Sequence, residues 1–316
     1  MDSIEFQRDL TRISVVVPVY GNLGDSLNIL CKRVHDVLGE QLMEVILVDD
    51  SSSDNNWRNI LVICDDFEKV KGLRLRKNFT QHNATWAGVC EAQGDIILTM
   101  DADLQHEPED IPRLLKTLEE NDHDIVYGNF VKRSDGVYRS IVSWFYRKLV
   151  RLAYGKRNYI SSSPFRIFKR ELISSYPANI GQSVSIDALV SWTTSRVGNV
   201  GLTQNPRHFG TSSFSTFGLF KHAINSLVAF SAMPIRFVAF SGIAISVGSF
   251  FVGAYLVVNY LLGRVDVVGF TFVALALVFF SGIQLLAIGI IGEYVGRIHS
   301  KTLLKPTFSI AEKFPR

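Results

Sequence analysis

The chain has 316 residues, a hydrophobic content of 47% and a formal net charge of +3 at pH 7. This length allows one large domain or two smaller ones, and so small a charge does not indicate nucleic-acid binding. Its cysteines, Cys31, Cys64 and Cys90, stand singly without the spacing of a metal site, which is typical of reduced thiols in the cytosol. The residues before Thr11 are polar and charged, so we expect no signal peptide there.

Strands and helices are expected to alternate over the first hundred residues. Short apolar runs rich in β-branched residues predict strands at 13–20, 44–48, 71–76 and 95–100. Helices are expected between them, near 25–38, 56–67 and 84–92. This alternation predicts a doubly wound α/β sheet, in which ligands bind at the carboxyl ends of the strands.

Polar residues gather where these predicted strands end. We expect one crevice to collect Pro18, Tyr20, Asp49, Asp50, Asn78, Gln81, Asp101 and Asp103. No glycine-rich dinucleotide fingerprint or P-loop sequence follows any of the strands, which counts against both of those folds. Asp49 or Asp50 would instead accept hydrogen bonds from a ribose or a base, as an acidic residue after a second strand does elsewhere.

A candidate metal site follows the fourth predicted strand. Asp101 and Asp103 lie two residues apart, so in extended geometry their side chains share one face, and Gln105 can follow them there. Two carboxylates and an amide oxygen suit Mg²⁺ or Mn²⁺, with the remaining positions left for water and phosphates. Because the Asp-x-Asp pattern is short, the alternative is a solvated turn whose aspartates cap the helix after Pro108.

Two long apolar runs occupy the last third of the chain, at 237–262 and 267–291. Each exceeds the roughly 20 residues that a helix needs to cross a bilayer, so we expect a hairpin of two transmembrane helices. A buried helical pair in a soluble core is the alternative. Arg236 precedes the first run and Arg297, Lys301 and Lys305 follow the second, which predicts that both termini are cytoplasmic and that these cations meet lipid phosphate.

Two stretches between the sheet and the hairpin combine cations with aromatic and aliphatic residues, at 138–154 and 214–230. Both patterns are typical of helices that lie in the headgroup region with an apolar face and a basic face. An ordinary amphipathic helix packed on the domain is the alternative for each.

Four ordered segments carry a resemblance to a known family: 15–20 (Val-Val-Val-Pro-Val-Tyr), 48–54 (Val-Asp-Asp-Ser-Ser-Ser-Asp), 76–82 (Arg-Lys-Asn-Phe-Thr-Gln-His) and 101–105 (Asp-Ala-Asp-Leu-Gln). The likeness continues through 207–212 and 291–297 and covers essentially the whole chain. Together these segments resemble inverting family 2 glycosyltransferases with the GT-A fold. They are most similar to the polyprenyl-phosphate type: dolichol-phosphate mannose synthases, bactoprenol glucosyltransferases and the undecaprenyl-phosphate formamidoarabinose transferase.

The resemblance implies a GT-A-like mixed sheet domain, then interfacial amphipathic helices and a two-helix transmembrane hairpin. It implies a cytoplasmic catalytic domain at 1–212, an interfacial helix at 213–233, the hairpin at 234–292 and a cytoplasmic tail at 293–316. The implied reaction moves one sugar from a UDP-sugar to undecaprenyl or another polyprenyl phosphate on the cytoplasmic face of the bacterial inner membrane. Such products serve cell-envelope polysaccharide, O-antigen or lipid A modification. The expected partners are the donor, the lipid acceptor and membrane lipid, without nucleic acid, and a homo-oligomer is left open.

The resemblance also assigns roles to residues. It implies that the nucleotide contacts Pro18, Tyr20, Asp49, Asp50, Asn78, Gln81 and Asp101. It implies that Asp101, Asp103 and Gln105 hold Mg²⁺ or Mn²⁺, that Asp103 and Arg166 are catalytic, and that Arg139, Arg166 and Arg207 contact the acceptor phosphate. Residues 161–164 read Ser-Ser-Ser-Pro where relatives of the glucosyl type tend to carry an acidic stretch, so the sugar is not assigned.

Two other functions are alternatives to this one. A processive polysaccharide synthase is disfavoured because the chain lacks a Gln-x-x-Arg-Trp sequence and has only two predicted spans. A non-catalytic membrane subunit that binds a nucleotide-sugar as a sensor or scaffold is disfavoured by the intact Asp-x-Asp-x-Gln sequence. Turnover separates an enzyme from such a subunit.

Overall fold

The structure, a computed structural model, describes residues 11–21, 25–52, 56–130, 163–181, 186–202, 233–262, 269–303 and 305–315. These residues belong to two compact units. One contains the strands and the shorter helices, and the other contains two long helices, α9 (Met233–Leu261) and α10 (Phe270–Thr302). The residues after α10 return to the first unit, so that unit contains both ends of the described chain.

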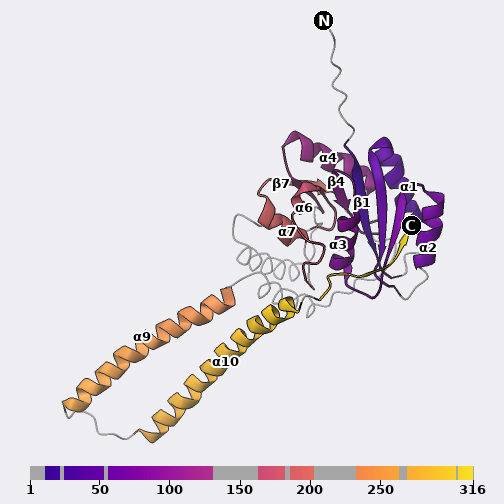
Figure 1. Ribbon diagram of the computed structural model, residues 1–316. Helices are drawn as coiled ribbons and strands as arrows, with labels where there is room; N and C mark the ends of the chain where they lie inside the picture. Colours follow the sequence, from indigo (N-terminus) through magenta and orange to yellow (C-terminus); the bar gives the residue numbers. More distant parts are fainter. Residues whose placement is uncertain are drawn as a thin grey trace. The chain divides into compact units, whose positions relative to one another are not determined.

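The first unit is built on one mixed sheet (Figure 1). Its described strands are β1 Ile13–Val19, β2 Leu42–Asp49, β3 Val70–Leu75, β4 Ile96–Thr99, β5 Ile125–Phe130, β6 Arg166–Lys169, β7 Val197–Leu202 and β8 Ile310–Phe314. They lie in the order β7-β5-β6-β4-β1-β2-β3-β8. The four strands β3, β2, β1 and β4 are parallel, whereas β6 and β8 run antiparallel to their neighbours. The mixed α/β sheet predicted from the sequence is therefore confirmed.

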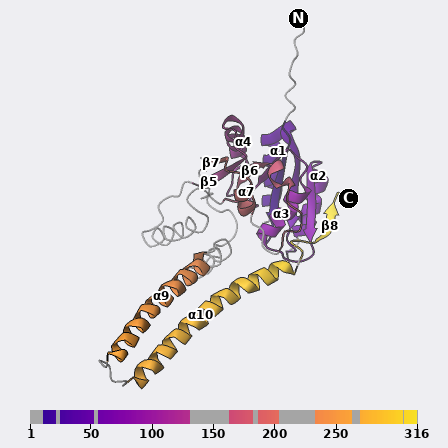
Figure 2. The ribbon, with the colours of Figure 1, turned by 60° about the vertical axis from the view of Figure 1, so that its left-hand side comes forward.

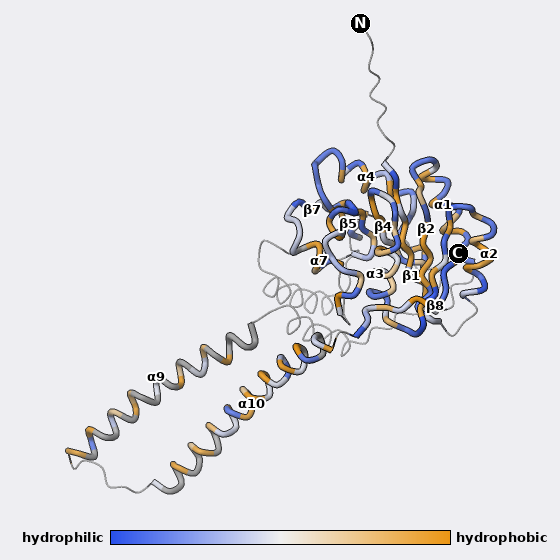
Figure 3. The backbone as a smooth tube through the Cα atoms, in the orientation of Figure 1, coloured by the Kyte–Doolittle hydropathy of each residue, from blue (hydrophilic) through white to orange (hydrophobic). Residues whose placement is uncertain are grey.

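Helices cover both faces of this sheet. They are α1 Ser26–Leu38, α2 Asn56–Asp66, α3 Gln81–Glu91, α4 Ile111–Glu120, α6 Glu171–Ser174 and α7 Ile186–Thr193, with short 3₁₀ turns at Gly39–Gln41 and Pro108–Asp110. Successive side chains of a strand point to opposite faces. Accordingly Val15 and Val17 pack with α1, α2 and α4, whereas Val16 packs with α3, α6 and α7. The apolar central strands between these layers are visible in Figure 3.

The structure differs from the expected element bounds in two places that concern the site. Helix α3 begins at Gln81, three positions before the predicted start, so the polar residues 81–83 form its first turn instead of a loop. Residues 310–314, expected to belong to a C-terminal tail, form β8 and pair antiparallel with β3. Figure 2 shows β8 as the yellow arrow at one edge of the sheet.

The second unit is a helical hairpin whose apolar side chains are largely exposed. Phe251, Tyr255 and Leu261 on α9 and Leu277 and Leu285 on α10 each expose more than three-fifths of their surface. These helices cover most of the predicted spans at 237–262 and 267–291. When only the described residues are counted, no helix is both long and apolar enough to cross a membrane, so membrane spanning stays a prediction. The stretches 138–154 and 214–230 lie outside the described residues.

Candidate active site

A cleft of about 430 Å³ lies at the carboxyl ends of β1, β2 and β4, where the sequence predicts a ligand crevice. Its lining residues are Pro18, Val19, Tyr20, Asp50, Asn78, Thr80, Gln81, Asp101, Ala102 and Asp103. The structure therefore brings together seven of the predicted site residues from four separate segments of the chain. Tyr20 remains 62% exposed, so its ring is available at the cleft to a planar ligand group.

The two adjacent carboxylates after β2 have different surroundings. Asp50 lines the cleft, and its Oδ1 accepts a hydrogen bond from the backbone N–H of Phe79 at 2.6 Å. Burial raises the pKa of Asp50 to about 6. Asp49 is fully buried and does not line the cleft; its Oδ1 accepts hydrogen bonds from the N–H and the hydroxyl of Ser52, at 3.2 and 2.8 Å. Of the two predicted contacts, Asp50 can face a ligand and Asp49 shapes the turn behind it.

The turn after β3 carries the polar residues of the next wall. Thr80 adopts a left-handed φ of 79°, and its N–H donates to Oδ1 of Asn78 at 3.1 Å. This turn aims the first residue of α3 at β4: Nε2 of Gln81 donates to Oδ1 of Asp101 at 2.6 Å. The helix can lie this close to the sheet because residue 88 is glycine. A Cβ there would stand 2.4 Å from Cγ1 of Val16.

The predicted metal ligands after β4 are only partly brought together. Asp101 and Asp103 both line the cleft, whereas Gln105 is not among its described lining residues. The N–H of Gln105 donates to Oδ1 of Asp103 at 3.1 Å, and Leu104 between them has a φ of 59°. In the described part of the chain, no group of three or more His, Cys, Asp or Glu side chains could hold a metal ion. A cation here would use two carboxylates and would complete its shell from water and the ligand.

The imidazole ring of His106 stacks on the ring of Phe165. The two ring centroids lie 5.0 Å apart, and only 2% of His106 is exposed. Burial lowers the pKa of His106 to about 4, so the imidazole is neutral at physiological pH. The residue therefore packs on Phe165 in the interior and adds no positive charge to the cleft.

The charged side chains that line the cleft indicate whether a divalent cation fits there. Asp50, Asp101 and Asp103 line it, and none of its described lining residues is Lys or Arg. A diphosphate would meet only like charge from these side chains, and carboxylate oxygens are the donors that Mg²⁺ and Mn²⁺ prefer. The residues present fit such an ion between Asp101, Asp103 and a diphosphate.

Arg166, a predicted catalytic residue, lies in a buried network outside the cleft. Its Nε donates to Oγ1 of Thr99 at 3.1 Å, and Nη1 pairs with the carboxylate of Asp187. The hydroxyl of Tyr127 donates to the same carboxylate at 3.0 Å. Because Thr99 is the last residue of β4, Arg166 supports the strand that leads to Asp101. Arg139 and Arg207 lie outside the described residues.

Sequence reasoning missed the partner of Arg166 and the different orientations of Asp49 and Asp50. Asp187 stands alone in its segment, and nothing local pairs it with Arg166, which is 21 positions away. The difference between Asp49 and Asp50 did have a signal, because neighbouring residues at the end of a strand point in opposite directions.

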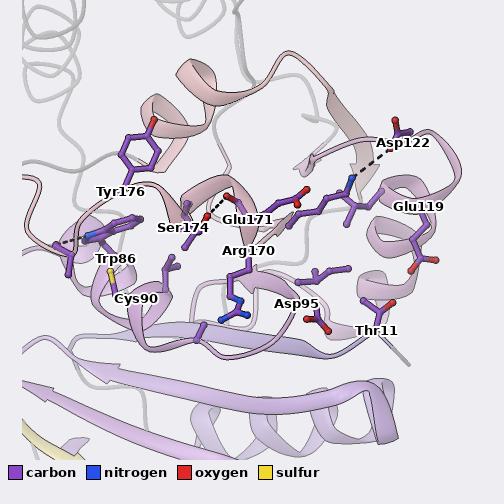
Figure 4. A pocket seen from close by; sticks show the side chains of 17 residues that line it. Thr11, Trp86, Cys90, Asp95, Glu119, Asp122, Arg170, Glu171, Ser174 and Tyr176 are labelled. Atoms are coloured by element: carbon purple, nitrogen blue, oxygen red, sulfur yellow. Dashed lines mark hydrogen bonds and ion pairs between the residues drawn. The ribbon is translucent and has the colours of Figure 1, made fainter. Parts of the chain in front are cut away.

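A larger cavity, of about 1030 Å³, lies at the other end of β4 (Figure 4). Its wall includes Trp86, Asp95 and Arg170, and the ammonium of Lys169 there already pairs with Asp122 and Asp124. None of the residues of the predicted nucleotide or metal site lines this cavity. The size of a cavity therefore does not identify the site here; the smaller cleft holds the clustered carboxylates.

Comparison with known proteins shows the family of this chain. The sequence pattern of glycosyl transferase family 2 matches residues 14–176. An undecaprenyl-phosphate 4-deoxy-4-formamido-L-arabinose transferase of Photorhabdus laumondii subsp. laumondii is 30% identical over 306 residues, across 95% of this chain and 94% of that protein. The protein of the same name from Yersinia enterocolitica is 31% identical over 306 residues, across 95% and 93%.

Solved structures show the same fold. Glucosyl-3-phosphoglycerate synthase from Mycobacterium tuberculosis, in complex with Mn²⁺, UDP-glucose and phosphoglyceric acid, superposes with a TM-score of 0.51 and 18% identity. The alignment covers 69% of this chain and 79% of that one. A likeness at this identity supports the fold of the sheet unit, and the relatives in the preceding comparison extend over the hairpin as well.

Proposed function

The chain belongs to glycosyl transferase family 2, and we propose that it transfers a single sugar from a UDP-sugar to undecaprenyl phosphate or a related polyprenyl phosphate. The observation that carries the donor half is the cleft at the carboxyl ends of the parallel strands. It gathers three carboxylates without a described cation, which suits a nucleotide diphosphate only together with a divalent metal ion. The M. tuberculosis synthase of the same fold was solved with Mn²⁺ and UDP-glucose, which supports this proposal.

The chain's own residues divide the work of binding the donor. Tyr20 offers an exposed ring for the base, and the carboxylate of Asp50, fixed by the N–H of Phe79, offers an acceptor for the hydrogen-bond donors of a uridine. Gln81 holds the carboxylate of Asp101 in place, and the positive end of α3 faces the cleft where the diphosphate would lie. Asp49 acts indirectly, through the turn at Ser52.

Asp101 and Asp103 are the residues that would hold Mg²⁺ or Mn²⁺. When bound, the ion stabilises the negative charge that develops on the leaving diphosphate. An oxygen of the lipid phosphate attacks the anomeric carbon of the sugar, the bond from that carbon to the diphosphate breaks, and UDP leaves with inversion. Because a phosphate acceptor is already an anion near neutral pH, the reaction needs no strong base. The main role of Asp103 would therefore be to hold the metal ion, and not to remove a proton.

The acceptor half of the proposal rests on the relatives and on the hairpin. Proteins 30 to 31% identical to this chain along most of its length are named as transferases that act on undecaprenyl phosphate. The apolar side chains exposed along α9 and α10 would be unfavourable in water over so large an area and are expected at a lipid surface. We therefore propose that the hairpin spans the bacterial inner membrane with both termini in the cytoplasm.

Arg139 and Arg207 remain the proposed contacts of the acceptor phosphate, since arginine binds phosphate through paired, charge-assisted hydrogen bonds. For Arg166 we propose a positioning role through Thr99 and β4, because its guanidinium is buried and engaged with Asp187. These residues do not determine which sugar is transferred.

Incubation of the membrane-embedded chain with undecaprenyl phosphate and a panel of radiolabelled UDP-sugars tests this function. We expect one sugar to appear in the lipid fraction. Mild acid should release it from the lipid product as a monosaccharide. Release of a polymer would indicate a processive synthase. Binding of a UDP-sugar without any transfer would indicate a non-catalytic subunit, and both results would contradict the proposal.

A further inference from the structure

The C-terminal strand β8 contacts the part of the sheet that forms the donor cleft. Gly72, Leu73, Arg74 and Leu75 of β3 lie opposite β8 in antiparallel register. The ladder continues beyond the strand end, because the N–H of Arg76 donates to the carbonyl of Ser309 at 2.9 Å. The next residues of the chain are those at 78–81, three of which line the cleft. A segment that follows the hairpin in sequence thus fixes the start of a cleft wall.

A series of side-chain contacts connects β8 with the turn that follows β2. Oε1 of Glu312 accepts a hydrogen bond from Nη1 of Arg74 at 3.0 Å, and its Oε2 accepts one from Nε1 of Trp57 at 3.2 Å. On the other side of the guanidinium, Nε of Arg74 lies 3.7 Å from Oδ2 of Asp49. That oxygen is buried and accepts no hydrogen bond from the described residues. Arg74 is therefore its described counter-charge.

Trp57 makes this arrangement rigid. Its ring packs on Gly72, where a Cβ would stand about 3 Å from the ring atoms, and the guanidinium of Arg74 lies 5.9 Å from the centroid of the same ring. Glu312 thus has two fixed donors, and Arg74 is held between a carboxylate on β8 and a carboxylate on β2.

We propose that β8 is a positioning element of the donor site and that Glu312 acts through Arg74 on Asp49. This inference rests on the proposed function, since the donor site is where the effect appears. Without Glu312, the partly exposed Arg74 gains freedom to turn into water, and the buried charge of Asp49 loses its partner. The turn at Asp49 and Ser52 then relaxes, and with it Asp50, the neighbouring residue that lines the cleft.

The chain offers a matched control at the next position. Lys313 lies on the same strand and pairs with Glu91 at 2.7 Å, and the side chains of Lys313 and Glu312 are half exposed, at 50% and 54%. Exposed ion pairs of this kind contribute little to stability. Glu312→Ala and Lys313→Ala each remove one half-exposed partner from β8, and only the first should also release Arg74 and so disturb the donor site.

The test measures the Kd of UDP in the presence of Mn²⁺, by calorimetry, on the full chain in detergent, with the Tm of each variant alongside. We expect Glu312→Ala to raise this Kd about three- to tenfold at a temperature well below its Tm, while Lys313→Ala leaves the Kd unchanged. Glu312→Gln should fall between the two, and adding Arg74→Gln to Glu312→Ala should cause little further loss, because both act on the same contact.

An unchanged Kd in Glu312→Ala would overturn the inference while leaving the proposed function in place. So would an equal loss in Glu312→Ala and Lys313→Ala, which would show that the strand acts only through stability. If the unaltered chain binds no UDP with Mn²⁺, the proposed function fails and the inference fails with it.

Discussion

Removing Asp187 should destabilise the sheet unit strongly, because it leaves a buried guanidinium without its counter-charge. Only 4% of Arg166 is exposed, and its guanidinium contacts the carboxylate of Asp187 and the hydroxyls of Thr99 and Tyr127. Breaking a buried pair by removing one partner typically costs about 3 to 5 kcal/mol. Since the Asp187 side chain is itself 16% exposed and the bond to Thr99 remains, we expect about 2 to 4 kcal/mol for Asp187→Ala.

Thermal unfolding of the full chain in detergent measures this effect. In a domain of this size, about 2 to 4 °C of Tm corresponds to 1 kcal/mol, so the Tm should fall by about 4 to 16 °C. The exposed pair of Arg33 and Glu109, with an Nε to Oε1 distance of 2.9 Å, provides the control. Glu109→Ala should lower the Tm by less than about 3 °C. Equal shifts in the two variants would refute the argument that Arg166 is held as a buried, paired charge.

Three further predictions follow from the site and the hairpin. Burial raises the pKa of Asp50 to about 6 from an ordinary value of 3.8. The folded state therefore binds a proton more tightly than the unfolded state, and the free energy of unfolding should fall as pH rises from about 4 to about 6. Urea unfolding at pH 4.5 and 7 should show this decrease in the unaltered chain and its loss in Asp50→Asn. Gly88→Ala should cost about 1 to 3 kcal/mol in the same assay, because the new Cβ would clash with Val16, and a neutral result would mean that α3 can move away from the sheet. A cysteine at Gly263 should react with an impermeant thiol reagent from the periplasm in intact cells whereas one at Ser300 should not, and equal protection of both would contradict the transmembrane hairpin.

Local sequence pattern was enough to predict the four parallel strands β1 to β4 and the cleft at their carboxyl ends. The β-branched runs around Val15 to Val17 and before Asp49 specify buried parallel strands, whose carboxyl ends must meet at one edge of the sheet. The polar residues after each strand therefore come together whatever the details of packing. Asp101, Asp103 and Asp50 line one cleft for this reason.

Contacts between distant segments could not be predicted in this way. Glu312 and Arg74 are 238 positions apart, and β8 is a short, half-exposed strand whose composition does not distinguish it from a tail. Likewise, the resemblance implied that Arg166 contacts the acceptor phosphate, and only the fold shows that Asp187 pairs with it. Which charged residues pair depends on the three-dimensional fold, and a single sequence gives little indication of such pairs.

The most direct test of the central claim is transfer of a labelled sugar from its UDP-sugar to undecaprenyl phosphate, with and without a chelator. We expect turnover with Mn²⁺ or Mg²⁺, its loss with EDTA, and its return when the metal is restored. Asp103→Asn should lower turnover about a hundredfold or more, since it removes a charge from the metal site and keeps the side-chain shape. Full turnover in EDTA, or in Asp103→Asn, would contradict a metal-dependent transferase whose site is the cleft between Asp50, Asp101 and Asp103.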